Sequence, residues 1–254
     1  MLDEVARITA EAGRIAAGRC GTAFDRWEKQ PGELVCDIDL EVDSFLRERL
    51  RALDPQAGWL SEETVDASDR YERRRLWVVD PIDGTRDYLR GRSGWAVSVA
   101  LVEDRVPVIG VLSAPARDEL WIAERGRGAT RNGERLRASG RIGLAGARVP
   151  ADQLPAADAD LVAVDKPNSI ALRIALVAAG EADLVATLKW GFEWDIAAAA
   201  LIAEEAGAAV SGALGQPLAF NTASGKAFGV LVSAPGIHAE AVERLRERAL
   251  EVVG

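Results

Sequence analysis

The chain is organised around LWVVDPIDGTRDYL, residues 76–89. The first four residues of this stretch form a short apolar run that is typical of a buried strand. Pro81 fixes its own φ and has no N–H to give to a sheet, so we expect the strand to end there. Asp80 and Asp83 then lie at the carboxyl end of the strand, where open α/β sheets bind their ligands.

The two residues that follow suit a phosphate. Gly84 lets the backbone approach a ligand closely. Thr85 adds a hydroxyl beside backbone N–H groups that could hold a phosphate. The alternative is an ordinary turn in which the aspartates are solvated caps, and such turns are common.

Two more acidic groups favour a ligand site over a plain turn. Glu62 and Glu63 follow the apolar pair Trp59-Leu60, and Asp195 lies in the stretch Glu193-Trp194-Asp195. Acidic residues beside an apolar run, three times over, are unusual for surface charge alone. They suit Mg²⁺, which takes oxygen ligands and binds through a few carboxylates and a substrate phosphate.

Together, WLSEE (59–63), DPIDGTRDYL (80–89) and EWDIAAA (193–199) resemble the signature of the inositol monophosphatase family. That family shares a superfamily with the bisphosphate nucleotidases and the fructose-1,6-bisphosphatases. The motifs stand in the family's order, and the resemblance covers nearly the whole chain. It implies a layered αβαβα sandwich, with an N-terminal α+β lobe over residues 1–137 that carries most metal ligands. A C-terminal α/β lobe over 138–254 completes one compact catalytic unit.

The resemblance also implies a set of metal and substrate ligands. Two or three Mg²⁺ ions would be held by Glu62, Asp80, the backbone carbonyl of Ile82, Asp83 and Asp195. Asp80 would bridge two of the ions. The substrate would meet Asp83, Gly84, Thr85, Lys189 and Asp195, with Gly84 and Thr85 contacting its phosphate through backbone N–H groups.

The family pairs a threonine with an aspartate on an earlier segment to orient the attacking water. By that resemblance Thr85 and Asp39 are catalytic, and Glu63 supports the metal ligands from beside them. The sequence departs from the family pattern at Cys36, where threonine is usual, and Asp37 adds a nearby carboxylate. Asp37 or Asp39 could instead simply cap the helix that follows.

The segment before Asp195 bears on the substrate. Inositol monophosphatases usually carry a glutamate about seven residues before the final metal aspartate, but Leu188 and then Lys189 stand here. Loss of an acid and gain of a base favour a more anionic substrate. LSEE and Glu193 also look more like the 3'(2'),5'-bisphosphate nucleotidases.

We therefore expect a Mg²⁺-dependent phosphomonoester hydrolase that removes the 3'-phosphate of 3'-phosphoadenosine 5'-phosphate by direct attack of metal-activated water. The first alternative is a phosphatase for inositol-1-phosphate or another small sugar or polyol phosphate. The second is a non-catalytic, metal-binding regulator on the same fold. The intact acidic set argues against this second alternative, because clustered charges are costly to keep without a use.

Composition narrows the remaining possibilities. The chain has 254 residues, 48% of them hydrophobic, and a net charge of −9, so we expect a packed core and no nucleic-acid partner. Cys20 and Cys36 make no disulfide framework, and the N-terminus carries acids, so we expect a cytoplasmic protein without a signal peptide. No apolar run is long enough for a membrane. His238 is expected at the surface, and a homodimer is the family's expectation.

Periodicity and turn residues predict the other elements. Residues 64–74 are expected to form a mobile solvated loop, and residues 138–158 a connector between the halves. Helices are predicted at 2–28, 40–53, 169–179, 194–206 and 237–252. Strands are predicted at 58–61, 76–79, 95–102, 106–113, 119–123, 161–164, 182–186 and 228–233.

Overall fold

The computed structural model describes residues 1–20, 26–30, 33–64 and 68–253. Its helices are α1 (Leu2–Arg19), α2 (Asp37–Leu53), α3 (Thr85–Leu89), α4 (Ile170–Ala178), α5 (Ala197–Glu205) and α6 (His238–Val253). Its strands are β1 (Arg26–Gln30), β2 (Glu33–Cys36), β3 (Gly58–Ser61), β4 (Arg75–Asp83), β5 (Ala96–Glu103), β6 (Val106–Ala114), β7 (Glu119–Glu124), β8 (Gly128–Arg131), β9 (Glu134–Arg135), β10 (Arg148–Pro150), β11 (Val162–Val164), β12 (Leu184–Phe192), β13 (Ala209–Ser211) and β14 (Lys226–Ser233). Short 3-10 helices include η1 (Ser68–Glu72) and η3 (Ala156–Asp158).

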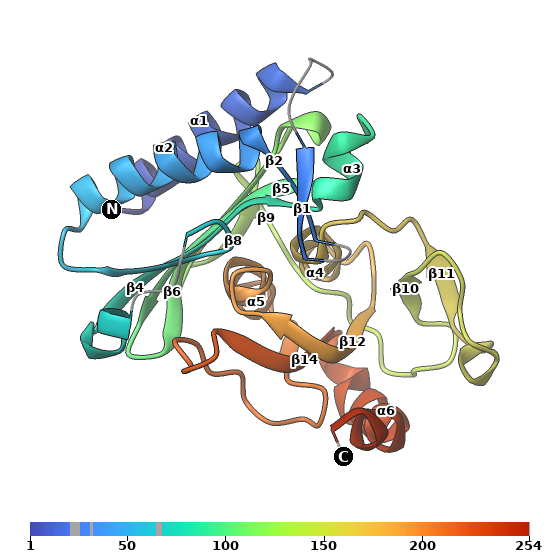
Figure 1. Ribbon diagram of the computed structural model, residues 1–254. Helices are drawn as coiled ribbons and strands as arrows, with labels where there is room; N and C mark the ends of the chain where they lie inside the picture. Colours follow the sequence, from blue (N-terminus) through green and yellow to red (C-terminus); the bar gives the residue numbers. More distant parts are fainter. Residues whose placement is uncertain (21–25, 31–32, 65–67, 254) are drawn as a thin grey trace.

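The elements stack in five layers, which confirms the predicted αβαβα sandwich (Figure 1). Helices α1 and α2 lie side by side on one face of a seven-stranded sheet of order β3-β4-β5-β6-β7-β8-β9. Helices α4 and α5 separate that sheet from a three-stranded sheet of order β12-β14-β13, and α6 covers the far side. Only β3 and β4 pair in parallel within the large sheet; its other pairs among the described strands are antiparallel.

Strand β4 contributes side chains to two hydrophobic cores. Leu76 and Val78 pack into the core around α5, whereas Trp77 and Val79 pack into the core beneath α1 and α2. Successive side chains of a strand point to opposite faces, and here both faces are covered by helices. That is why the sequence shows a continuous apolar run in this strand rather than an alternating one.

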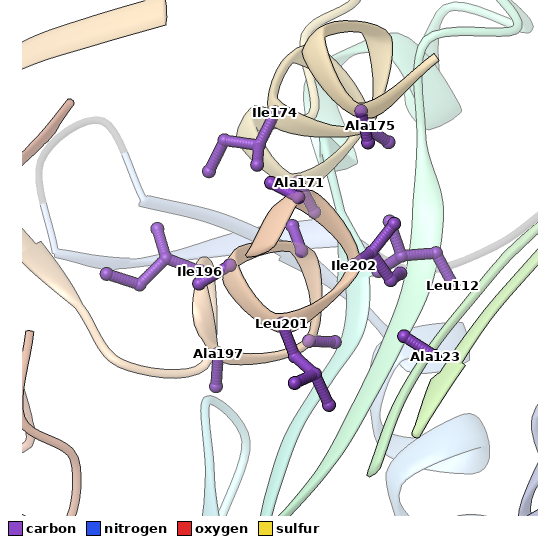
Figure 2. Close-up of a cluster of buried hydrophobic side chains, with 14 of the residues drawn as sticks. Leu112, Ala123, Ala171, Ile174, Ala175, Ile196, Ala197, Leu201 and Ile202 are labelled. Atoms are coloured by element: carbon purple, nitrogen blue, oxygen red, sulfur yellow. The ribbon is translucent and has the colours of Figure 1, made fainter. Parts of the chain in front are cut away.

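Helix α5 packs directly against the large sheet. Its sequence, AAAALIAEE, offers small side chains, and Figure 2 shows Ala197, Leu201 and Ile202 in a cluster with Leu112 and Ala123 of the sheet. Gly110 of β6 makes the approach possible. A Cβ on Gly110 would lie 2.6 Å from the carbonyl oxygen of Ala198.

Replacing Gly110 by alanine is therefore expected to destabilise the protein by about 1–3 kcal/mol, the usual cost of overpacking a core. The atoms in the way belong to the backbone of α5 and cannot rotate aside. Thermal unfolding should show a melting temperature lower by roughly 2–4 °C per kcal/mol. Gly143→Ala is the control, since nothing lies within 4 Å of a Cβ there. Equal melting temperatures for the two variants would contradict the tight contact between α5 and β6.

The first helix is shorter than predicted. It ends at Arg19, and residues 26–30 form β1, which pairs antiparallel with β2. The buried face of α1 stops at Ala16, so no apolar stripe holds a longer helix against the core, and Gly18 weakens it further. Residues 21–25, predicted as part of this helix, and the break at Pro31-Gly32 lie outside the described residues.

Strand β4 does not end at Pro81 as predicted. It continues to Asp83, and its pairing with β5 shifts register between Asp80 and Asp83. An irregularity of this kind admits a residue without an N–H, which reconciles Pro81 with the strand. Both carboxylates are thereby held by the sheet and not by a free loop.

Two expectations about surface residues were wrong. Arg70, in the predicted solvated loop 64–74, is fully buried on η1, whereas residues 65–67 of that loop lie outside the described part. His238 is half-buried, with Nδ1 2.9 Å from the Ser233 hydroxyl and Nε2 3.0 Å from the Ser211 hydroxyl. It begins α6, which packs on the sheet that carries both serines, and this packing buries the ring.

The predicted connector 138–158 carries structure of its own. It contains β10, which pairs in parallel with β11, and the short helix η3. The core around α5 draws on both predicted lobes, for example through Leu112 and Ala175. The lobe boundary at residues 137 and 138 stays a prediction. In the described part of the chain, every helix is too short or too polar to cross a bilayer.

Candidate active site

Two acidic motifs come together because two neighbouring strands are parallel. Glu62 directly follows β3, and its N–H donates to the carbonyl of Val79 on β4 (3.3 Å). Parallel strands end at the same edge of a sheet, so Glu62 and Glu63 lie beside the end of β4 that carries Asp80 and Asp83. Asp80 is 1% exposed and Asp83 7% exposed.

Asp83 is fixed by the start of α4. Its Oδ2 accepts hydrogen bonds from the Ser169 hydroxyl (2.5 Å) and the N–H of Ala171 (2.8 Å), and its Oδ1 accepts from the N–H of Ile170 (3.3 Å). Ser169 is also the N-cap of α4. A carboxylate at a helix N-terminus is stabilised by the unpaired amides there. The first and second halves of the chain are joined at this point.

Gly84 has a left-handed backbone with φ +93°. A Cβ at this position would lie 2.7 Å from the carbonyl oxygen of Gly94 and 2.8 Å from the nitrogen of Ser169. Glycine is therefore needed both for its φ and for space. In this structure the close approach that Gly84 permits is to the chain's own backbone, and its predicted contact with a phosphate stays a prediction.

Thr85 begins the five-residue helix α3. Its hydroxyl donates to the carbonyl oxygen of Ile82 at 3.0 Å. Two predicted site groups, the carbonyl ligand and the catalytic hydroxyl, are therefore direct neighbours. The predicted pairing of Thr85 with Asp39 stays a prediction.

Asp39 makes the helix-capping contact that the sequence offered as an alternative to a catalytic role. Its Oδ2 accepts from the N–H of Cys36 (2.8 Å) and from the Cys36 thiol (3.0 Å), and Cys36 is the N-cap of α2. Burial, helped by the charge of Asp39, raises the pKa of the Cys36 thiol to about 12, so the thiol keeps its proton and donates. The cysteine thus fills the capping position where the family usually has threonine. Asp37, the other capping candidate, pairs with Arg19 (3.3 Å).

The acidic residues act on one another electrostatically. We call Glu62, Asp80, Asp83 and Asp195 the acidic cluster. Burial raises the pKa of Asp80 well above its usual value, and the charges of the other three members and of Asp39 raise it further. Burial, with the charge of Asp83, raises the pKa of Asp195 to about 7. Burial also raises the pKa of Asp83, although its three hydrogen-bond donors oppose the shift.

The acidic cluster fits Mg²⁺ in the kind of ligand it offers. Carboxylates and the Ile82 carbonyl are the oxygen donors that hard cations prefer, and a dication offsets the repulsion that raises the pKa of Asp80. Within the described residues, no three acidic, histidine or cysteine side chains are gathered closely enough to form a ready-made metal site. The fit is therefore one of chemistry, and the number and identity of the ions stay predictions.

A pocket of about 350 Å³ opens beside this cluster. Of the predicted site residues, Asp83, Asp195 and Lys189 line it. The other predicted residues lie outside the lining: Asp39, Glu62, Glu63, Asp80, Ile82, Gly84 and Thr85. Asp195 lies in the turn between β12 and α5, where the N–H of Phe192 approaches its Oδ2 at 3.4 Å.

Sequence reasoning missed much of the pocket wall. Arg86, Lys166, Asn168 and Arg173 also line the pocket. Arg173 is braced, since its Nε donates to the carbonyl of Pro167 (2.7 Å) and its Nη2 to that of Asn168 (2.6 Å). One signal was available: the polar segment 165–169 joins a strand to a helix, as the acidic turn after β4 does.

The chain is similar to proteins of known class along nearly its full length. The sequence model described as the inositol monophosphatase family matches residues 1–252. An inositol-1-monophosphatase of Mesorhizobium japonicum is 38% identical over 205 residues, covering 72% of this chain and 73% of that protein. The 3'(2'),5'-bisphosphate nucleotidase CysQ of Aggregatibacter actinomycetemcomitans is 32% identical over 244 residues, covering 87% of each. The solved structure of a Thermotoga maritima IMPase matches with a TM-score of 0.84 and 28% identity, covering 100% of this chain and 99% of that one.

Proposed function

The chain belongs to the inositol monophosphatase family and is a phosphatase, and from that premise we propose that it is a Mg²⁺-dependent hydrolase of 3'-phosphoadenosine 5'-phosphate. The reaction would release the 3'-phosphate. The alternative within the family is inositol-1-phosphate or another small sugar or polyol phosphate. Relatives of both kinds support this choice of candidates without deciding between them.

The charge of the pocket carries the choice. Among the described residues, four basic side chains line it together with two aspartates: Arg86, Lys166, Arg173 and Lys189 beside Asp83 and Asp195. A monoester has one phosphate, and the ions held by the acidic cluster would bind it. Lys166 already pairs with Asp152 (2.5 Å), and Arg173 donates to two backbone carbonyls. Lys189 is therefore the group that best suits a second phosphate, because charge-assisted hydrogen bonds to phosphate are the strong ones.

Strand geometry also disfavours an inositol ring. Leu188 stands where inositol monophosphatases usually carry a glutamate for the ring hydroxyls. Thr187 and Lys189 line the pocket, but Leu188 packs with the core beneath α6 instead. Neighbouring side chains on a strand point to opposite faces, so the pocket here is faced by a base and a hydroxyl.

The proposed mechanism assigns a task to each residue. Glu62, Asp80, Asp83, Asp195 and the Ile82 carbonyl would hold Mg²⁺, which neutralises phosphate charge and lowers the pKa of water when it is bound. Thr85 and Asp39 would orient the attacking water and take up its proton. Gly84 and Thr85 would bind the scissile phosphate through their N–H groups, and Glu63 would support its neighbours.

Lys189→Ala tests the substrate. Lys189 is exposed at the pocket, where its ammonium can meet a second phosphate. A charge-assisted contact is worth roughly 1.5–3 kcal/mol. We therefore expect kcat/KM on 3'-phosphoadenosine 5'-phosphate to fall about ten- to a hundredfold. Activity on inositol-1-phosphate, which carries only the scissile phosphate, should change little.

Lys226→Ala is the matched control. It removes the same charge from the neighbouring strand β14, and Lys226 is not itself part of the pocket lining, although its ammonium lies over the ring of Phe192, which is. Equal losses on both substrates in Lys189→Ala would point to the shared phosphate site. If kcat/KM of Lys189→Ala were unchanged on both substrates, the Lys189 side chain would not contact the substrate. Inositol-1-phosphate would then be the preferred candidate substrate.

Phosphate release with and without Mg²⁺ tests the metal and separates an enzyme from a regulator. A protein that released phosphate from neither substrate in Mg²⁺ would favour the non-catalytic, metal-binding alternative. A homodimer, which the family resemblance suggests, and a cytoplasmic location, which the cysteine content suggests, remain predictions. Sedimentation of the purified protein would check the first of them.

A further inference from the structure

Arg70, on η1, is a fully buried arginine. Its Nη1 donates to the side-chain oxygen of Asn221, and its Nη2 donates to the carbonyl of Thr222 (2.9 Å). The guanidinium also lies 4.3 Å from the centre of the Tyr71 ring, and the Tyr71 hydroxyl donates to the carbonyl of Ala223 (2.8 Å). Burying a charge is costly unless it is well bonded, so this set of contacts fixes η1 against the loop 221–223.

The same loop holds a buried glutamate. The N–H groups of Asn221 (2.6 Å) and Thr222 (2.8 Å) donate to the carboxylate of Glu193, and the Thr222 hydroxyl adds a third bond (2.5 Å). Glu193 has no exposed surface. Its backbone is fixed as well, because its N–H donates to the carbonyl of Gly225 (2.9 Å).

Glu193 in turn fixes the turn that carries Asp195. The carbonyl of Glu193 accepts from the N–H of Ile196 (3.2 Å) and that of Ala197 (2.9 Å), which starts α5. Asp195 therefore lies between two fixed points. Before it, the Glu193 side chain is hydrogen-bonded to the loop, and after it, the start of α5 is hydrogen-bonded to the Glu193 carbonyl. The other end of the chain of contacts is η1, which packs against β3, the strand that ends directly before Glu62. A Cβ on Gly58 of β3 would lie only 3.1 Å from the Cβ of Arg70.

We propose that Arg70 is a positioning residue for the acidic cluster. It ties η1, and the strand β3 that ends directly before Glu62, to the loop 221–225, and through Glu193 to the turn that carries Asp195. The acids contributed by the first half of the chain are thereby held at a set separation from the acid contributed by the second half. This inference rests on the proposed function, since it assumes that Glu62 and Asp195 bind the same ions.

Arg70→Lys keeps the positive charge and removes the forked donor geometry that reaches Asn221 and Thr222 together. Residues that orient metal ligands from behind typically contribute about 10–100-fold in metal affinity or activity. We expect Mn²⁺ to bind at least about tenfold more weakly, measured from the free-ion paramagnetic resonance signal. With p-nitrophenyl phosphate and saturating Mg²⁺, kcat should fall by about tenfold while KM changes less.

Hydrogen exchange on the metal-free protein gives a readout that does not depend on turnover. The amides of Asn221 and Thr222, which donate to Glu193, should exchange faster in Arg70→Lys than in the wild type. Arg74→Ala is the matched control, because Arg74 pairs at the surface with Glu103 (2.9 Å) and its side chain is 71% exposed. It should leave Mn²⁺ affinity and exchange unchanged.

Thr222→Val supplies a second variant if Arg70→Lys does not fold. It removes only the hydroxyl bonded to Glu193 and should weaken Mn²⁺ binding in the same direction. A folded Arg70→Lys or Thr222→Val protein with wild-type Mn²⁺ affinity and exchange would overturn the proposal, even if its melting temperature were lower. A wild-type protein that bound no Mn²⁺ would instead overturn the proposed function.

Discussion

Asp80→Asn is expected to nearly abolish Mg²⁺-dependent phosphate release, and so is Asp195→Asn. Each substitution removes one charge from the acidic cluster and leaves the shape of the side chain. The loss of one electrostatic stabiliser of a transition state costs on the order of 10²–10³-fold in rate, and a lost metal ligand should cost at least that much. Phosphate release at saturating Mg²⁺ measures the effect.

The fold should survive Asp80→Asn. Burial and neighbouring carboxylates raise the pKa of Asp80, so its ionised form destabilises the metal-free protein as pH rises above the usual carboxyl range. An amide carries no charge, and its oxygen can still accept from the N–H of Ile82, as Asp80 does at 3.0 Å. The metal-free melting temperature at neutral pH should therefore not fall. Circular dichroism checks this, with the exposed Asp3→Asn as control. Near-normal turnover in Asp80→Asn or Asp195→Asn would refute its assignment as a metal ligand.

Thr85→Ala is expected to lose about 10²-fold or more in kcat, the scale of a positioned acid–base group. Metal binding should be retained, because the predicted ligands are untouched. Thr85→Ser keeps the hydroxyl and should restore most of the rate. Stopped-time phosphate assays and a Mn²⁺ titration on the same preparations separate the two effects.

The hydrogen bond from Thr85 to the Ile82 carbonyl defines the opposing outcome. If the hydroxyl served chiefly to hold that carbonyl, its loss would weaken metal affinity and leave kcat intact at saturating metal. That result would show that Thr85 holds the Ile82 carbonyl in place and does not orient the attacking water. The pair of measurements decides between the two roles.

Apolar runs predicted the core of the fold because burial leaves a direct trace in sequence. The strand at 58–61 matches in both bounds, and the final helix is off by one residue at each end. The run through Pro81 was misjudged because a shift of register between strands depends on the partner strand, which the local sequence does not show. The first helix was overextended because the end of its packing face at Ala16 depends on what lies against it.

In the candidate site too, residues in contiguous motifs could be predicted from the sequence, whereas a residue that depends on tertiary packing could not. Asp80 and Asp83 were predicted because their motif is contiguous, Asp195 because it belongs to a second motif, and Lys189 because it shortly precedes that motif. Of these four residues, Asp83, Asp195 and Lys189 line one pocket. Arg70 was missed, since its partners lie about 150 positions away and an arginine in a polar stretch predicts solvent. Its burial is a tertiary property, set by the docking of η1 on the loop 221–225.

The bond between Asp83 and Ser169 spans 86 positions of the chain, which has a consequence for biosynthesis. Ribosomes add about 5–20 residues per second, so Ser169 is made roughly 4–17 s after Asp83. Until then the Asp83 carboxylate has neither the hydroxyl nor the amides that hold it in the finished protein. The nascent chain therefore carries Asp80 and Asp83 several seconds before Asp83 can form its final hydrogen bonds, and Asp195, the last of the predicted metal ligands, is made later still.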